Sequence, residues 1–422
     1  MIDPTDLHGA LRDPALTSMT FLNEVASHYP DAISLAAGRP YEEFYDVEDL
    51  HRYLRRFTRH LSEDLGYDKG AVRRTLFQYG RTKGIIHHLV ARNLSVDEGI
   101  EIDPEAVVVT VGCQEAMFLV LRALRATADD VLLAVSPTYV GLTGAARLTD
   151  LPVRPVATGA DGIDLDDLVA QAKAARAEGL RPRALYVMPD FANPSGRSLG
   201  LATRERLLEI AAEQDLLLLE DNPYGLFHGD HPRVPTLKAL DTRRRVVYLG
   251  SFAKTALPGV RVGYVVADQR VRGGGPLADE LAKLKSMLTV NTSAIAQAVA
   301  GGKLLEHDCS LVAANRRERE VYAANLTHLT DGLAKRFGED SGVTWTVPSG
   351  GFFIVVDVPF VVDDALLERS AHDFGVLWTP MGHFYDHDGE VRALRLSCSA
   401  VTPARIDQGL DRLAGFVSAQ LG

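Results

Sequence analysis

The sequence predicts an α/β fold: a mostly parallel sheet covered by helices on both faces, joined to a smaller α+β domain. Two observations predict it. Between about residues 107 and 266, short apolar runs alternate with helical segments, a pattern typical of parallel strands buried on both faces. After about residue 275 the chain changes to long helices, then short strands, then a last helix, which indicates an α+β unit.

The elements follow one another in a regular order. Residues 1 to about 30 form an arm with a short amphipathic helix, and about 45–100 is mostly helical with a break at Gln78-Tyr79-Gly80. Alternating strands and helices come next. We expect strands at 107–111, 131–135, 184–188, 216–219, 246–249 and 261–266, and helices at 114–126 and 203–214.

The last third completes the second unit. We expect long helices from about 276 to 337, strands at 343–347, 352–358 and 394–397, and a helix over 403–419. This pattern predicts three parts. Residues 1–45 are the arm and part of the small domain, 46–300 are the large α/β domain, and 301–422 are the C-terminal small α+β domain.

Composition excludes several classes of protein. Hydrophobic residues make up 46% of the 422 residues and charged residues 24%, as in an ordinary globular protein. A net charge of -11 gives no sign of binding to nucleic acid or to an anionic membrane. Cys113, Cys309 and Cys398 have no CxxC spacing, which fits a reducing cytoplasm. We find neither a signal-peptide pattern nor an apolar run of membrane-spanning length.

Lys254 is the most informative residue. It lies between two expected strands, and a Pro-Gly turn and then Arg261 follow it within seven positions. A lysine between two buried strands is hard to explain as a solvated surface charge. An amine held in a site, where a lowered pKa makes it a nucleophile toward an aldehyde, explains it better.

Other polar residues follow the expected strands at their carboxyl ends, where open α/β sheets bind ligands. Gly112-Cys113-Gln114 opens an expected helix, so its backbone N–H groups can bind a phosphate. Ser251 and Arg261 can complete that phosphate-binding site. Asp221 ends an expected strand that contains four leucines, where an unpaired carboxylate is costly. A protonated pyridinium nitrogen would remove that cost.

Three further residues complete this pattern. Asn193 and Tyr224 suit a phenolate oxygen, and Tyr139 suits the face of an aromatic ring. Phosphate, pyridinium, phenolate, ring face and amine together describe pyridoxal 5'-phosphate held as a Schiff base on lysine. Simpler interpretations stay open: Asp221 as a turn or helix-capping residue, the Asn193 segment as a turn, and Tyr139 as a core aromatic.

Seven stretches occur in the order found in one family, between about residue 33 and the end. The chain resembles the fold-type I pyridoxal phosphate enzymes, specifically the class I/II aminotransferases. The stretches are Leu76-Phe77-Gln78-Tyr79-Gly80, Val109-Thr110-Val111-Gly112-Cys113-Gln114-Glu115-Ala116, Ser136-Pro137-Thr138-Tyr139, Asn193-Pro194-Ser195-Gly196, Glu220-Asp221-Asn222-Pro223-Tyr224, Ser251-Phe252-Ala253-Lys254 and Arg395-Leu396-Ser397.

The resemblance implies roles for the site residues. Lys254 carries the Schiff base and shuttles a proton, and Asp221 keeps the ring nitrogen protonated. The other cofactor contacts are Asn193 and Tyr224 at the ring hydroxyl, Tyr139 on the ring, and Cys113, Gln114, Ser251 and Arg261 at the phosphate. The family often has Ser or Ala in place of Cys113 and Ser in place of Ala253, so side-chain contacts to the phosphate are less secure there.

The resemblance also implies contacts beyond the cofactor. Tyr79 reaches the phosphate from the other subunit of a homodimer, and Arg395 pairs with the substrate α-carboxylate beside Asn193 and the backbone near Gly38. Arg39 lies where the family closes over substrate and reads a second acidic or polar group, or else is a surface arginine. Arg395 as a structural ion-pair residue and Tyr79 as a core aromatic are the corresponding alternatives.

The expected activity is transamination between an L-amino acid and a 2-oxo acid. The 2-aminoadipate and aromatic aminotransferase-like branch is the broad placement. The Gly38-Arg39-Pro40 and Gly80–Gly84 stretches resemble transaminases of non-proteinogenic amino acids in secondary metabolism, of the dihydroxyphenylglycine type. Alternatives are a lyase or an oxidase that uses the same cofactor, and a non-catalytic sensor that binds it.

Two histidine pairs suggest a metal site, but less strongly than the residues above suggest a cofactor site. His383 and His387 lie near Asp386 and Asp388, and His228 lies three positions before His231. Glycines bracket the first pair, so we expect a polar loop that faces substrate through Phe384 and Tyr385, and no metal.

Overall fold

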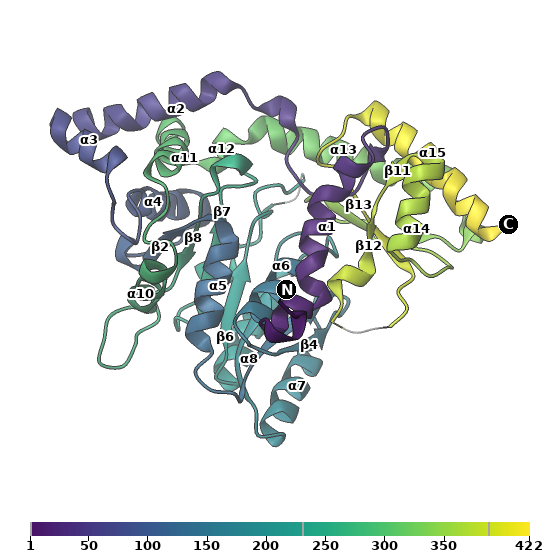
Figure 1. The fold of residues 1–422 in the computed structure, drawn as a ribbon, viewed down its shortest axis with the longest axis horizontal. Coiled ribbons are helices and arrows are strands. Elements are labelled where there is room, and N and C mark those ends of the chain that lie inside the picture. The colour runs from purple at the N-terminus through teal and green to yellow at the C-terminus, as the bar shows by residue number, and fades with distance from the viewer. Residues whose placement is uncertain (1, 230–231, 387–388) are drawn as a thin grey trace.

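The centre of the molecule is a mostly parallel sheet, seen in a computed structural model that describes residues 2–229, 232–386 and 389–422 (Figure 1). Within these residues it has seven strands in the order β2-β8-β7-β6-β5-β3-β4. β8 runs antiparallel to both neighbours, and the other pairs are parallel. The strands are β2 (Val107–Thr110), β3 (Asp130–Ser136), β4 (Val153–Ala157), β5 (Arg181–Val187), β6 (Leu217–Asp221), β7 (Val246–Ser251) and β8 (Gly263–Val266).

Helices cover both faces of this sheet, which confirms the predicted fold class. Successive strand residues point to opposite faces. Leu132 and Leu219 pack with the helices of one face, whereas Leu133 and Leu218 pack on the other. The first face carries α5 (Gly112–Leu124), α6 (Val140–Leu148) and α10 (Leu277–Leu288). The second carries α7 (Leu165–Ala177) and α8 (Leu201–Glu213), with α2 (Val47–Arg59), α4 (His87–Glu98) and α11 (Ala294–Glu306) beside them.

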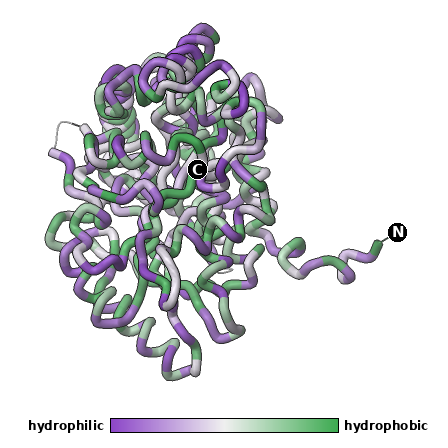
Figure 2. The backbone as a smooth tube through the Cα atoms, turned by 90° about the vertical axis from the view of Figure 1, so that its left-hand side faces the viewer, coloured by the Kyte–Doolittle hydropathy of each residue, from purple (hydrophilic) through white to green (hydrophobic). Residues whose placement is uncertain are grey.

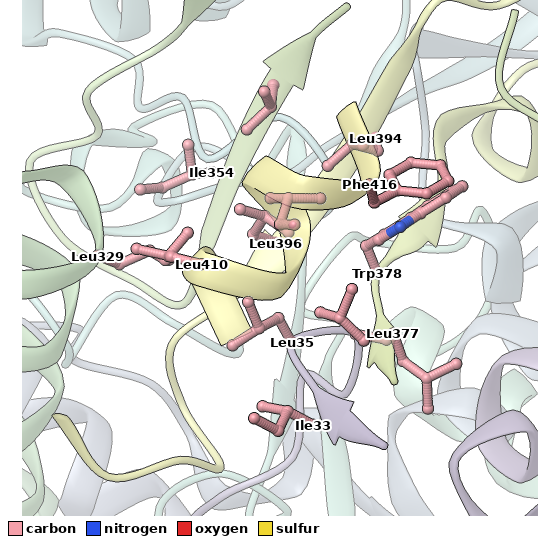
Figure 3. Packing of buried hydrophobic residues seen from close by; sticks show 14 of the residues in the cluster. Ile33, Leu35, Leu329, Ile354, Leu377, Trp378, Leu394, Leu396, Leu410 and Phe416 are labelled. Atoms are coloured by element: carbon pink, nitrogen blue, oxygen red, sulfur yellow. The ribbon is translucent and has the colours of Figure 1, made fainter. Parts of the chain in front are cut away.

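A second hydrophobic core joins the two ends of the chain. Ile33 and Leu35 pack with Leu377, Leu396 and Phe416 (Figure 3). An antiparallel sheet has the order β12-β13-β10-β9, and β1 pairs with β11 in parallel. The elements are β1 (Ile33–Ser34), β9 (Thr344–Trp345), β10 (Phe353–Asp357), β11 (Val376–Leu377), β12 (Thr379–Pro380), β13 (Ala393–Ser397), α13 (Arg316–Arg336), α14 (Asp364–Arg369) and α15 (Pro403–Leu421).

The remaining helices each pack against at least one of the hydrophobic cores. They are α1 (Pro14–His28), α3 (Lys69–Phe77), α9 (Leu237–Leu240) and α12 (Leu311–Ala314). α3 ends at Phe77, so the predicted helical break at 78–80 is confirmed. Among the described residues, no helix is both long enough and apolar enough to cross a membrane.

The main differences from prediction are local. The strand predicted over 261–266 begins at Gly263, because Arg261 has left-handed backbone (φ 52°) in the loop before it. β4 was not predicted, since Pro155 interrupts its apolar pattern. β1, β11 and β12 have two residues each, too few for a periodic signal. The limits at residues 45 and 300 stay predictions.

The shared core predicts a stability effect far from the large sheet. Leu35→Ala removes a fully buried side chain contributed by the N-terminal segment. We expect it to lower the free energy of unfolding by about 2–5 kcal/mol, measured by denaturant titration. Leu421→Ala, at an exposed position near the C-terminus, is the control and should change it by less than about 0.5 kcal/mol. Equal small effects in both variants would contradict the shared core.

Candidate active site

Lys254 lies just beyond the carboxyl end of β7. Ser251 closes this strand, and its hydroxyl accepts a hydrogen bond from the backbone N–H of Ala253 at 3.1 Å, which shapes the turn before the lysine. Lys254 Nζ donates to the carbonyl oxygen of Gly38 at 2.7 Å. Burial lowers the pKa of Lys254 to about 8, helped by the positive charges of two arginines. Near neutral pH, part of the Lys254 amine is therefore in the neutral form that can attack an aldehyde.

Asp221 is buried at the end of the neighbouring strand, β6. It is 2% exposed, and the Tyr186 hydroxyl donates to its Oδ2 at 2.6 Å. The Cys113 thiol lies 3.6 Å from its Oδ1. Burial raises the pKa of Asp221 to about 6, and the hydrogen bonds from Tyr186 and Cys113 act in the opposite direction. A cation bound beside this carboxylate would favour its ionised form, which fits a protonated pyridinium nitrogen.

Tyr186 is a site residue that the sequence analysis missed. It lies within β5 and is buried, and burial raises the pKa of its hydroxyl. The available signal was a tyrosine within the apolar run 184–188, because a buried tyrosine hydroxyl requires a partner. The Cys113 side chain does not point toward the expected phosphate site, because its thiol faces Asp221. Any phosphate contact by Cys113 therefore depends on its backbone N–H.

Glycines allow two segments, the start of α5 and the segment 261–263, to approach each other closely. Gly112 has a φ of 70°, and a Cβ there would lie 2.5 Å from Nη2 of Arg261. A Cβ on Gly263 would lie 2.6 Å from the backbone nitrogen of Cys113. The helix N-terminus and the Arg261 guanidinium are thus close together, as binding of a phosphate requires. Gln114 completes the first turn, and its side-chain amide donates to the carbonyl of Gly141 at 2.6 Å.

Arg395 lies on β13 and is 5% exposed. Its guanidinium donates to Asn193 Oδ1 and, at 3.0 Å, to the carbonyl of Ala36. The rings of Phe353 and Phe384 flank it, with centroids 4.2 and 4.9 Å from Cζ. Burial lowers the pKa of Arg395 to about 10. Among the described residues its buried Nε has no hydrogen-bond partner, so a carboxylate ligand would satisfy a donor that the protein leaves unpaired.

The remaining predicted cofactor residues surround these groups. Tyr139 and Asn193 line one pocket together with Tyr186. Tyr224 is buried, and its hydroxyl interacts with the Asn193 side chain. Burial raises the pKa values of both Tyr139 and Tyr224, so each hydroxyl stays a proton donor. The structure therefore brings the predicted ring-binding residues to the same edge of the sheet as Asp221.

Two predicted residues do not join this cluster within one chain. Tyr79 follows α3 and is 85% exposed. Arg39 is exposed and lies 3.7 Å from the carboxylate of Glu42. A contribution from Tyr79 to the site of a second chain requires such exposure, and it stays a prediction. The surface pair is the simpler interpretation of Arg39, whose substrate contact also stays a prediction.

The histidine pairs are only partly described. His231 and His387, with Asp388, lie outside the described residues. His383 bridges Ser18 and Asp364 through its two ring nitrogens, at 2.9 and 2.8 Å. In the described ranges, no group of three or more His, Cys, Asp or Glu side chains is placed to hold a metal ion. The adjacent Phe384 packs on Arg395, as a loop facing substrate would require.

These residues meet the chemical requirements of pyridoxal 5'-phosphate one by one. The amine of Lys254 suits an aldehyde, and the buried Asp221 carboxylate suits a pyridinium. The glycine-lined helix start beside Arg261 suits a phosphate. The donor set therefore fits the cofactor that the sequence suggests.

Comparison with known proteins supports the same assignment. The family model "Aminotransferase class I and II" matches residues 67–413. The chain is 58% identical, over 98% of its length and 94% of the relative's, to the (S)-3,5-dihydroxyphenylglycine transaminase of Amycolatopsis orientalis.

Two solved structures resemble the chain along its length. A kynurenine aminotransferase of Pyrococcus horikoshii, solved with PMP, is 26% identical with a TM-score of 0.84, and the match covers 100% of this chain and 98% of that one. The α-aminoadipate aminotransferase LysN of Thermus thermophilus, complexed with N-(5'-phosphopyridoxyl)-L-leucine, is 27% identical with a TM-score of 0.80, covering 100% and 99%. The chain belongs to the class I and II aminotransferases and is a pyridoxal 5'-phosphate-dependent enzyme of that family.

Proposed function

We propose that the chain transaminates a non-proteinogenic amino acid with an aromatic side chain, and that (S)-3,5-dihydroxyphenylglycine represents this substrate class. The relative at 58% identity is named as a transaminase of this compound. That relative carries the substrate class, and Arg395, a buried guanidinium with an unpaired Nε among the described residues, carries the binding of the α-carboxylate that all amino acids share. Its flanking rings, Phe353 and Phe384, provide an aromatic wall beside the expected α-carboxylate.

The cofactor, when bound, supplies an electron-withdrawing ring that makes the Cα proton of the amino acid acidic. The chain's own residues hold and orient it. Lys254 would attach the aldehyde covalently, and Asp221 would keep the ring nitrogen protonated. Asn193 and Tyr224 would hold the ring hydroxyl, and Tyr139 would cover the ring. The backbone of Cys113, together with Gln114, Ser251 and Arg261, would hold the phosphate.

Lys254 also serves as the acid and base at Cα. A general base works best when its pKa lies near the operating pH, and burial lowers the pKa of Lys254 to about 8. Once freed from the aldehyde, its Nζ would take the Cα proton and would return it at the carbon of the former aldehyde group. Arg395 and Asn193 hold the α-carboxylate fixed during this transfer.

The reaction of Lys254 with the cofactor should depend on pH in a defined way. Covalent uptake of pyridoxal 5'-phosphate by the apoprotein is expected to accelerate as the pH rises to about 8, because only the neutral amine attacks an aldehyde. Below that value, the neutral fraction and the uptake rate fall about tenfold per pH unit. Stopped-flow absorbance measures this rate.

Two variants control this experiment. Lys254→Ala is expected to abolish both the absorbance change and turnover, while Lys283→Ala, at an exposed lysine, keeps both. A rate that still rises up to 10.5, the ordinary lysine pKa, would contradict the buried-amine assignment.

A panel of amino acids tests the proposed substrate class. The enzyme with bound cofactor is mixed with each amino acid, and absorbance and mass spectrometry follow the amination of the cofactor and the keto acid. Arylglycines are expected to react at lower concentrations than acidic or aliphatic amino acids. Release of ammonia or peroxide would favour a lyase or an oxidase instead, and no reaction with any member would favour a sensor.

Arg395→Gln is the matched variant for this panel. Charged hydrogen bonds contribute about 1.5–3 kcal/mol, so the half-saturating concentration should rise about 10–100-fold for every amino acid while cofactor binding persists. An unchanged half-saturating concentration would remove Arg395 from the carboxylate site. Arg39→Gln distinguishes a second recognition residue from a surface arginine, since recognition predicts a loss limited to polar side chains.

We further propose a homodimer with shared sites. Tyr79, Phe77 and Met287 are large and exposed at the ends of α3 and α10. The N-terminal segment projects from the body and exposes Ile2 and Leu7 (Figure 2). Exposed apolar surface of this kind favours contact with another chain.

Sedimentation tests the dimer, because a single chain has a mass of 45.9 kDa and the dimer twice that. Mixing Lys254→Ala with Tyr79→Ala should restore activity through one intact site per mixed dimer. A monomer at micromolar concentration, or a mixture without activity, would contradict the shared site.

We also propose that the protein works in the cytoplasm. Cys113, Cys309 and Cys398 are all free thiols. Free thiols persist in reducing compartments. Cell fractionation tests this, and recovery of the protein from the medium would contradict it.

A further inference from the structure

A buried ion pair lies in the first turn of α5, next to the expected phosphate-binding backbone. Glu115 is 8% exposed and Lys285, on α10, is 0% exposed. Lys285 Nζ donates to Glu115 Oε2 at 2.7 Å, and the Thr289 hydroxyl donates to Oε1 at 2.6 Å. Lys285 also donates to Thr289 at 2.9 Å. The two helices are therefore joined through one carboxylate.

The same carboxylate holds the segment that precedes the helix. The backbone N–H of Val111 donates to Glu115 Oε2 at 2.6 Å. Glu115 therefore binds the backbone N–H of the N-cap residue from the fourth helical position, as the glutamate of a capping box does from the third. Gly112 comes next, in left-handed backbone (φ 70°) against Arg261. Glu115 thus sets the direction of the N–H groups that follow Val111.

Charge makes this arrangement a problem for a phosphate site. The positive end of a helix stabilises one anion most strongly when no other anion is close. Glu115 already places a carboxylate in that first turn, so an unpaired Glu115 would repel a phosphate bound there. Lys285 supplies the compensating positive charge at 2.7 Å, from a position that solvent does not reach.

We propose that Lys285 is a positioning residue for the cofactor phosphate: it neutralises Glu115, which can then hold Val111 without repelling the phosphate. The proposal rests on the assignment of the α5 N-terminus to the phosphate in the proposed function. A merely structural ion pair would stabilise the fold equally with and without cofactor. A positioning role instead changes the affinity for the phosphorylated cofactor.

The test compares two ligands and one pair of matched variants. Pyridoxal 5'-phosphate and pyridoxal share the aldehyde and the ring, and only the first has the phosphate. Lys285→Met leaves Glu115 charged and unpaired, so the Kd of apoprotein for pyridoxal 5'-phosphate is expected to rise at least about tenfold, with little change for pyridoxal. Lys283→Met, an exposed position on the same helix, should change neither Kd.

The double variant provides the rescue. In Glu115→Gln with Lys285→Met, the amide oxygen still accepts from Val111 and no charge remains, so the Kd for pyridoxal 5'-phosphate should return to within about threefold of wild type. If Lys285→Met does not fold, Glu115→Gln alone carries the test. It removes the repelling carboxylate, so a tenfold rise in its Kd would overturn the proposal.

The outcomes separate this inference from the proposed function. Equal losses for pyridoxal 5'-phosphate and pyridoxal in Lys285→Met would overturn the positioning role and leave the function intact. Failure of the double variant to recover affinity would also overturn it. Wild-type protein that takes up neither aldehyde covalently would instead overturn the assignment of Lys254.

Discussion

The site depends on the burial of charged groups that have too few partners within the protein. Asp221 ends one strand, Lys254 follows the next, and Arg395 comes from the C-terminal part of the chain. Burial shifts the pKa of each group in the direction that favours its neutral form. Buried charges without full compensation are costly, and they persist where a large core offsets the cost. The cores on both faces of the sheet and the core shared by the chain ends supply that stability.

The parallel sheet explains why these groups meet. Asp221 ends β6 and Ser251 ends the adjacent β7, so the fold places both at one edge. This part of the site was predictable from the sequence, because apolar strands followed by single polar residues leave a clear pattern. Lys254 and Asn193 were identified for the same reason, together with motifs that occur in the order of the family.

Contacts between distant segments left no comparable signal. Tyr186 reads as a core residue of its strand, and its bond to Asp221 appears only once the two strands are aligned. Lys285 and Glu115 lie 170 positions apart, on helices that each look amphipathic. Arg261 follows Val260 and precedes Val262, an alternation that predicts a strand, yet its left-handed backbone turns the guanidinium toward Gly112. Local patterns predict elements and their order, whereas these contacts depend on tertiary packing.

The pairing of β1 with β11 also orders events during synthesis. Once Val266 has emerged from the ribosome, every strand of the large sheet is available. The sheet can therefore form while the rest of the chain is still being synthesised. Ile33 has no partner strand until Val376 emerges. The segment around Ile33 and Leu35 is therefore an exposed apolar stretch for most of translation, and its protection until then falls to chaperones or to transient contacts with the sheet that has already formed.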